Sequence, residues 1–145
     1  MVSINIWAVI VAAVVMFVIG GIWYGPLFGK QWAKLIGMSD ESMKAMRAKG
    51  MSGMAGSYIL MFVGALVMCF VLASTITSAV YFRTPHIGGV AWGFHTAFWA
   101  WLGFIAPVTL GTVLWEKKSW KLWLLNNGYW LVALLVAGFI IGSWM

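Results

Sequence analysis

Four long apolar segments, separated by short polar ones, make up the hydrophobic pattern of this chain. Segments 1–29, 50–82 and 122–145 contain no charged side chain, and segment 84–115 contains only two histidines and no charge. An α-helix needs about 20 residues to cross a hydrocarbon core of about 30 Å, so each segment is long enough to span a bilayer. The pattern predicts an all-α, polytopic integral membrane protein with four transmembrane helices.

Turn residues set the boundaries that we predict for these spans. We expect one four-span domain, 1–145, with spans at about 5–25, 53–81, 88–114 and 122–144. The first span ends near Pro26, because proline lacks a backbone donor and disfavours helical geometry at the preceding residue. The inner loop 26–52 then contains two short amphipathic segments, 30–36 and 39–50, which suit helices lying at the lipid headgroups.

Composition and charge agree with this location. The chain is 63% hydrophobic and only 8% charged, whereas charged residues make up about 25% of an average soluble protein. All but one of its nine basic residues fall in segments 26–52 and 115–121, the exception being Arg83. Short basic loops resist translocation across the membrane, so we expect both segments on the inner side of the membrane and both termini on the outer side. No soluble fold presents a basic stripe, and nucleic acid is therefore not an expected partner.

Small residues recur at four-residue spacing within the spans. The pairs are Gly21 and Gly25, Gly89 and Gly93, and Gly138 and Gly142. Such spacing lets helix backbones approach closely in lipid, where van der Waals contact drives association. The pairs predict tight helix packing, either within one chain or between copies, and they motivate the expectation of a homo-oligomer, with a dimer favoured.

Polar side chains inside the spans form a candidate intramembrane site. They are His95, Thr109, Thr112, Asn126, Asn127 and Tyr129. An ionisable residue at membrane depth is a functional hypothesis by default, and His95 could relay a proton, bind a ligand or metal, or remain a neutral imidazole bonded within the bundle. The two amides need hydrogen-bond partners that lipid does not offer, so they either bond between helices or hold a ligand.

No catalytic constellation accompanies these residues. The three acidic residues, Asp40, Glu41 and Glu116, all lie outside the predicted spans, which argues against a proton-coupled pump. Cys69 is the only cysteine, which excludes an intrachain disulfide and a cysteine-based metal site. No nucleophile, base and orienting acid occur together, and no glycine-rich phosphate loop opens a helix. We therefore expect no enzymatic activity, no cofactor and no bound metal.

Three motifs resemble those of a known family. Residues 21–30 read Gly-Ile-Trp-Tyr-Gly-Pro-Leu-Phe-Gly-Lys, residues 101–104 read Trp-Leu-Gly-Phe, and residues 124–129 read Leu-Leu-Asn-Asn-Gly-Tyr. Together they resemble the bacterial membrane-protein family catalogued as domain of unknown function seventeen sixty-one, over nearly the whole chain. The resemblance implies a small integral protein of a bacterial cytoplasmic membrane and supplies no established activity.

Two functional hypotheses follow from these patterns. The leading one is a self-associating helical bundle that serves as a packing or ligand-binding platform, with membrane lipids or an apolar small molecule as partners. The alternative is facilitated permeation of a small solute along a path lined by His95, Thr109, Thr112, Asn126 and Tyr129. A redox or lipid-modifying enzyme is a third class. The permeation hypothesis requires that its polar side chains face one cavity.

Overall fold

The computed structural model describes residues 3–82 and 88–145, which form helices joined by turns and contain no strand. Four of its helical segments are long and apolar enough to cross a membrane, namely Ile6–Leu27, Ala55–Phe82, Gly89–Leu114 and Trp120–Ser143. Each begins and ends within two residues of its predicted boundaries. The predicted all-α architecture with four membrane-spanning helices is confirmed, while Arg83 lies outside the described residues.

The first span changes its helical geometry before it reaches the inner loop. Helix α1, Ile6–Ile22, begins at Asn5, whose side chain accepts hydrogen bonds from the first free backbone N–H groups. It continues as a π-helical turn, η1, Trp23–Leu27, which contains Pro26 and a non-helical Gly25. The first span was predicted to end near Pro26, and the helical geometry breaks at Gly25, one residue before it.

The third span is interrupted in a similar way. Helix α5, Gly89–Ala100, passes through a π-helical turn, η2, Trp101–Ile105, into α6, Ala106–Leu114. Pro107 has no backbone N–H to donate to the preceding helical turn, and η2 ends two residues before it. A π-turn inserts an extra residue and rotates everything beyond it around the helix axis.

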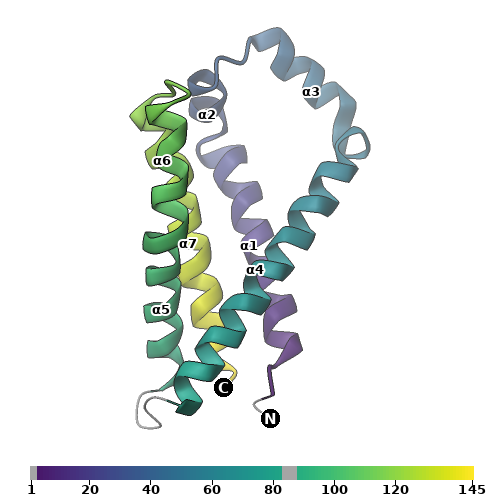
Figure 1. Ribbon diagram of the computed structural model, residues 1–145. Coiled ribbons are helices and arrows are strands. Elements are labelled where there is room, and N and C mark those ends of the chain that lie inside the picture. The colour runs from purple at the N-terminus through teal and green to yellow at the C-terminus, as the bar shows by residue number, and fades with distance from the viewer. Residues whose placement is uncertain (1–2, 83–87) are drawn as a thin grey trace.

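Two shorter helices lie across one end of the bundle (Figure 1). Helix α2, Gly29–Leu35, is followed by Gly37 in the left-handed region at φ +75°. Helix α3, Asp40–Gly53, starts at Ser39, whose hydroxyl accepts from the backbone N–H of Ser42 at 3.2 Å. The helical geometry of α3 is broken at Gly50, where φ is +60°. Short interfacial helices in this loop were predicted from its amphipathic pattern.

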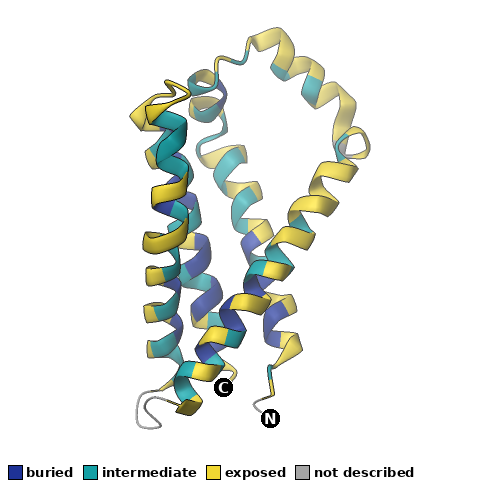
Figure 2. Cartoon of the chain, viewed as in Figure 1, coloured by how far each residue is buried: buried dark blue, intermediate teal, exposed yellow. Residues whose placement is uncertain are grey.

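Helix α7, Trp120–Ser143, packs against both α1 and α5 and carries many of the buried residues. Helix α4, Ala55–Phe82, crosses the bundle near the chain termini and diverges from it toward α3 (Figure 1). Its buried residues, Cys69, Leu72, Ala73 and Ile76, therefore all lie in its second half, and its first half is exposed or only partly buried (Figure 2). The Cys69 thiol lies 3.4 Å from the Met16 sulfur inside the core.

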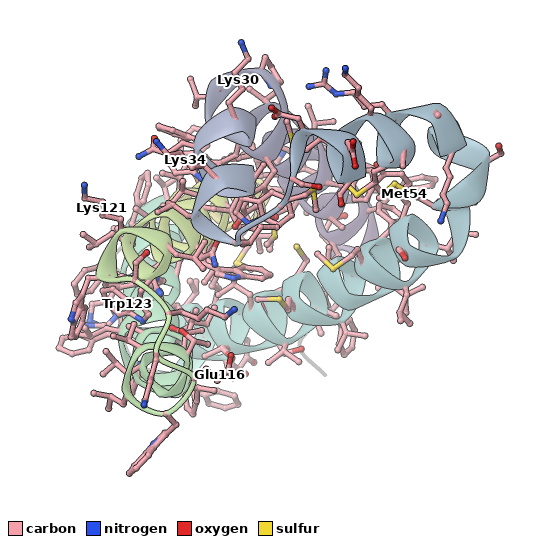
Figure 3. The ribbon with its side chains drawn as sticks, turned by 90° about the horizontal axis from the view of Figure 1, so that it is seen from above. Lys30, Lys34, Met54, Glu116, Lys121 and Trp123 are labelled. Atoms are coloured by element: carbon pink, nitrogen blue, oxygen red, sulfur yellow. The ribbon has the colours of Figure 1, made fainter. Side chains whose placement is uncertain are left out.

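Both chain termini lie at the same end of the bundle, as four antiparallel crossings require, while α2 and α3 lie at the opposite end (Figure 1). Viewed from above that opposite end, Lys30 and Lys34 project from α2, and Lys121 lies near the start of α7 (Figure 3). The basic segments that the sequence assigned to one side of the membrane are therefore at one end of the molecule.

Candidate functional site

A half-buried hydroxyl and a buried amide join the third and fourth spans. Asn127 is only 2% exposed and donates from Nδ2 to the Thr109 hydroxyl at 3.0 Å. The same hydroxyl accepts from the Trp123 indole at 3.1 Å and donates to the Ile105 carbonyl at 2.8 Å. A hydroxyl has one donor and two acceptor positions, so its bonding capacity is filled. The Trp101 indole N–H also donates to the backbone carbonyl of Asn127 at 3.1 Å, which connects η2 to α7.

A second set of hydrogen bonds joins the first and fourth spans. The Trp23 indole donates to the Leu125 carbonyl at 3.1 Å, and the Tyr24 hydroxyl donates to the Asn126 side-chain oxygen at 3.0 Å. Both donors belong to η1, where the wide turn directs two successive aromatic side chains toward α7. Further into the bundle, the Tyr129 hydroxyl donates to the α1 carbonyl of residue 16 at 3.4 Å. These bonds fix the register of α1 against α7.

Five of the six predicted polar residues line one hollow at the basic end of the bundle. This inner hollow has a volume of about 350 Å³, and its wall includes Thr109, Thr112, Asn126, Asn127 and Tyr129. Among the described residues, no buried side-chain nitrogen or oxygen lacks a hydrogen-bond partner. Most of these groups bond to one another or to the backbone, so the hollow joins the helices, and the Asn126 Nδ2 group is left without a hydrogen-bond partner in the described part of the chain.

His95 lies elsewhere, in a groove between α4 and α5. This α4–α5 groove has a volume of about 780 Å³, and its polar residues are Thr75, Ser78, His95 and Thr96. The Nε2 atom of His95 lies 3.0 Å from the Trp99 indole nitrogen. An indole N–H can only donate, so this bond requires a neutral imidazole that carries its proton on Nδ1. The Nδ1–H group forms no hydrogen bond within the described part of the chain.

The walls of the α4–α5 groove are apolar and aromatic. Leu72 and Leu134 come from α4 and α7, and Trp92, Trp99 and Phe104 come from α5 and η2. The hydroxyls of Thr75 and Ser78 donate to backbone carbonyls of their own helix at 2.9 and 2.8 Å, which leaves their oxygens as acceptors. The groove therefore offers an apolar surface with a small number of polar groups, as small-molecule sites commonly do.

The glycine pairs of the third and fourth spans face each other within the chain. A Cβ atom added to Gly93 would collide with the Gly138 carbonyl, and one added to Gly89 would collide with the Gly142 carbonyl. Helices α5 and α7 are therefore in backbone contact. Around Gly21 and Gly25, by contrast, no atom of a neighbouring helix lies within 4 Å of an added Cβ.

Comparison with known proteins places these features in a family. The sequence model of the family described as protein of unknown function (DUF1761) matches residues 7–142. The chain belongs to the DUF1761 family. No curated protein matches this DUF1761 member, and no solved structure matches it. The family resemblance seen in the sequence motifs is thereby confirmed over nearly the whole chain.

In this DUF1761 protein the candidate permeation path is split between two hollows. His95 lines the α4–α5 groove, whereas Thr109, Thr112, Asn126 and Tyr129 line the inner hollow. An uninterrupted α-helix would place Thr109 on the same face as His95, but η2 inserts an extra residue between them and rotates Thr109 toward α7. In the described ranges 3–82 and 88–145, no three His, Cys, Asp or Glu side chains are grouped to hold a metal ion.

Tryptophan and tyrosine residues near the ends of membrane spans commonly act as anchors at the membrane surface, but several of those in this DUF1761 chain do not. Trp23, Tyr24 and Trp123 instead direct their polar atoms into the bundle and bond α7 or α6. Trp7 and Trp115 are largely exposed, as anchors would be.

Proposed function

We propose that this DUF1761 protein is a non-catalytic binding platform whose α4–α5 groove takes a membrane-dissolved amphiphile. The proposal is supported by the unpaired Nδ1–H of His95 within a largely apolar groove of about 780 Å³. Pockets of about 300–1,000 Å³ are typical of small-molecule sites. The inner hollow instead joins the helices, because most of its polar groups bond one another or the backbone.

The position of His95 limits the chemistry of the ligand. His95 follows the start of α5 by six residues, which corresponds to a depth of about 9 Å at 1.5 Å per residue. At this depth a donor without a partner is costly, so a ligand that brings an acceptor oxygen recovers a hydrogen bond. A long apolar chain with a carbonyl or ether oxygen fits both the donor and the apolar walls.

Photolabelling tests this ligand class. Two diazirine-bearing probes of equal chain length, a long-chain ketone and the corresponding hydrocarbon, are added to the protein in nanodiscs, and their adducts are mapped by mass spectrometry. We expect the ketone to label α4 and α5 in preference to the hydrocarbon, and His95→Leu to abolish this preference. The control is Phe94→Leu, on the same helix but outside the groove lining. Adducts spread evenly over the lipid-facing surface, or an unchanged preference in His95→Leu, would contradict the proposal.

Self-association is the second part of the proposed function, and the first half of α4 supports it. Residues 55–61 are largely exposed, with Ile59 and Leu60 at 65% and 74%, while the Tyr58 ring packs edge-on against Phe17 of α1. A membrane helix usually packs at least one face on a neighbour, and a second copy would supply that neighbour. The glycine pairs on α5 and α7 are already used within the chain, so we place a dimer contact on α4.

Cysteine crosslinking in nanodiscs tests this contact. We expect Leu60→Cys to form a disulfide-linked dimer, and Val108→Cys, which is equally exposed at 76% on α6, to remain monomeric. Native mass spectrometry of the unmodified protein should show the same dimer. A monomer at all protein concentrations, or equal crosslinking at both positions, would refute a dimer through α4.

We also propose that the protein lies in a bacterial cytoplasmic membrane with segments 26–52 and 115–121 inside and both termini outside. The support is the location of eight basic residues in these two segments at one end of the bundle. The negative surface of the inner leaflet attracts such residues, each contributing about 1 kcal/mol near the membrane surface.

A further inference from the structure

A pocket distinct from the α4–α5 groove lies at the basic end of the molecule. It has a volume of about 470 Å³ and is enclosed by η1, α2 and α3. The turn at Gly25 and Pro26 makes room for it by directing α2 away from the axis of α1. Gly29 allows the start of α2 to pack closely against η1, because an added Cβ would lie 2.6 Å from the Tyr24 carbonyl oxygen. We call this space the headgroup pocket.

Two cations from different helices line the headgroup pocket. Lys30 comes from α2 and Arg47 from α3. Neither side chain forms an ion pair or hydrogen bond with any residue that the structure describes. The acids of α3, Asp40 and Glu41, are not part of the lining, and Glu116 lies across the end of the molecule from Lys30 (Figure 3). The pocket thus carries positive charge that the surrounding residues do not neutralise.

The remaining lining is largely apolar. Leu27, Met43 and Met46 contribute aliphatic and thioether surface, and Trp32 contributes an indole ring. Methionine side chains adapt to irregular apolar shapes, and tryptophan is enriched where hydrocarbon meets the headgroups. Since the first span ends at Leu27, the pocket lies at that boundary. Its occupant should therefore combine negative charge with an apolar portion.

We propose that the headgroup pocket binds the phosphate of an anionic phospholipid. The guanidinium of Arg47 suits two phosphate oxygens at once, and the ammonium of Lys30 adds a second charge from the other helix. The glycerol and upper acyl carbons then contact Leu27 and Met46. Such a lipid would link α2 to α3 through its phosphate.

Lipid binding to the delipidated full-length protein, measured by native mass spectrometry, tests this site. The probes are phosphatidylglycerol, phosphatidylcholine of the same chain length, and inorganic phosphate. The paired variant Lys30→Gln with Arg47→Gln removes both pocket charges. The control, Lys34→Gln with Lys44→Gln, removes one charge from each of the same helices outside the pocket lining.

We expect phosphatidylglycerol to bind in preference to phosphatidylcholine, and the pocket variant to weaken phosphatidylglycerol binding by at least about tenfold while the control changes it by about twofold or less. Circular dichroism of both variants checks that the helices are retained. Equal weakening in both variants would show general surface attraction and overturn the site. Inorganic phosphate binding as tightly as phosphatidylglycerol would overturn the lipid and indicate a small-anion site.

Discussion

The backbone contact between α5 and α7 makes a quantitative prediction for Gly138→Ala. The added methyl would collide with the Gly93 carbonyl and lie 3.0 Å from the Ala97 Cβ. Neither neighbour can rotate away, since one is backbone and the other is a single methyl group. The helices must separate, and overpacking of this kind costs about 1–3 kcal/mol. Replacing glycine by alanine also favours a helix by up to about 1 kcal/mol, which partly hides the cost.

A matched variant separates these two effects. Gly64→Ala makes the same change in α4, where no atom lies within 4 Å of the added Cβ. The free energy of unfolding of each variant is measured by titrating mixed micelles with sodium dodecyl sulfate and following circular dichroism. We expect Gly138→Ala to be less stable than Gly64→Ala by about 1–3 kcal/mol. A difference below about 0.5 kcal/mol would show that the helices do not meet at this glycine.

Two further substitutions test the polar contacts and the turn, with the same unfolding assay. Thr109→Val removes the acceptor shared by Asn127 and the Trp123 indole, and should lower the free energy of unfolding by about 1–3 kcal/mol. In the control Thr112→Val, the lost hydroxyl donates only to a carbonyl of its own helix, so the free energy of unfolding should fall by about 0.5 kcal/mol or less. Equal losses in the two variants would contradict the role of Thr109 as a shared acceptor. Gly29→Ala should destabilise η1 by about 1–3 kcal/mol because of the collision with the preceding turn, and unchanged stability would show that this turn opens freely.

The number and limits of the spans could be predicted because they depend on length and hydropathy alone. Partner helices were harder to predict. Thr109 and Asn127 lie at similar distances from the polar turn before Trp120, so an antiparallel pair of spans brings them together. The Tyr24–Asn126 bond joins positions 102 residues apart, and nothing in the sequence pattern connects them.

Helical periodicity also failed at one identifiable place. Counting 3.6 residues per turn from His95 places Thr109 on the same face, but the count assumes an uninterrupted α-helix. The π-turn at Trp101–Ile105 breaks that count. Pro107 indicates an interruption of the helix at this place, but a proline alone does not predict a change of face. The separation of the polar residues into two hollows follows from this turn.

The most direct test of the account is the side of the membrane from which each end of the bundle can be labelled. Single cysteines replace Ser3, Lys44 and Lys118 in a Cys69→Ala background, and a membrane-impermeant maleimide is applied to right-side-out and inverted vesicles. We predict that positions 44 and 118 react only in inverted vesicles and position 3 only in right-side-out vesicles. Labelling of positions 44 and 118 from opposite sides would contradict the four-span arrangement.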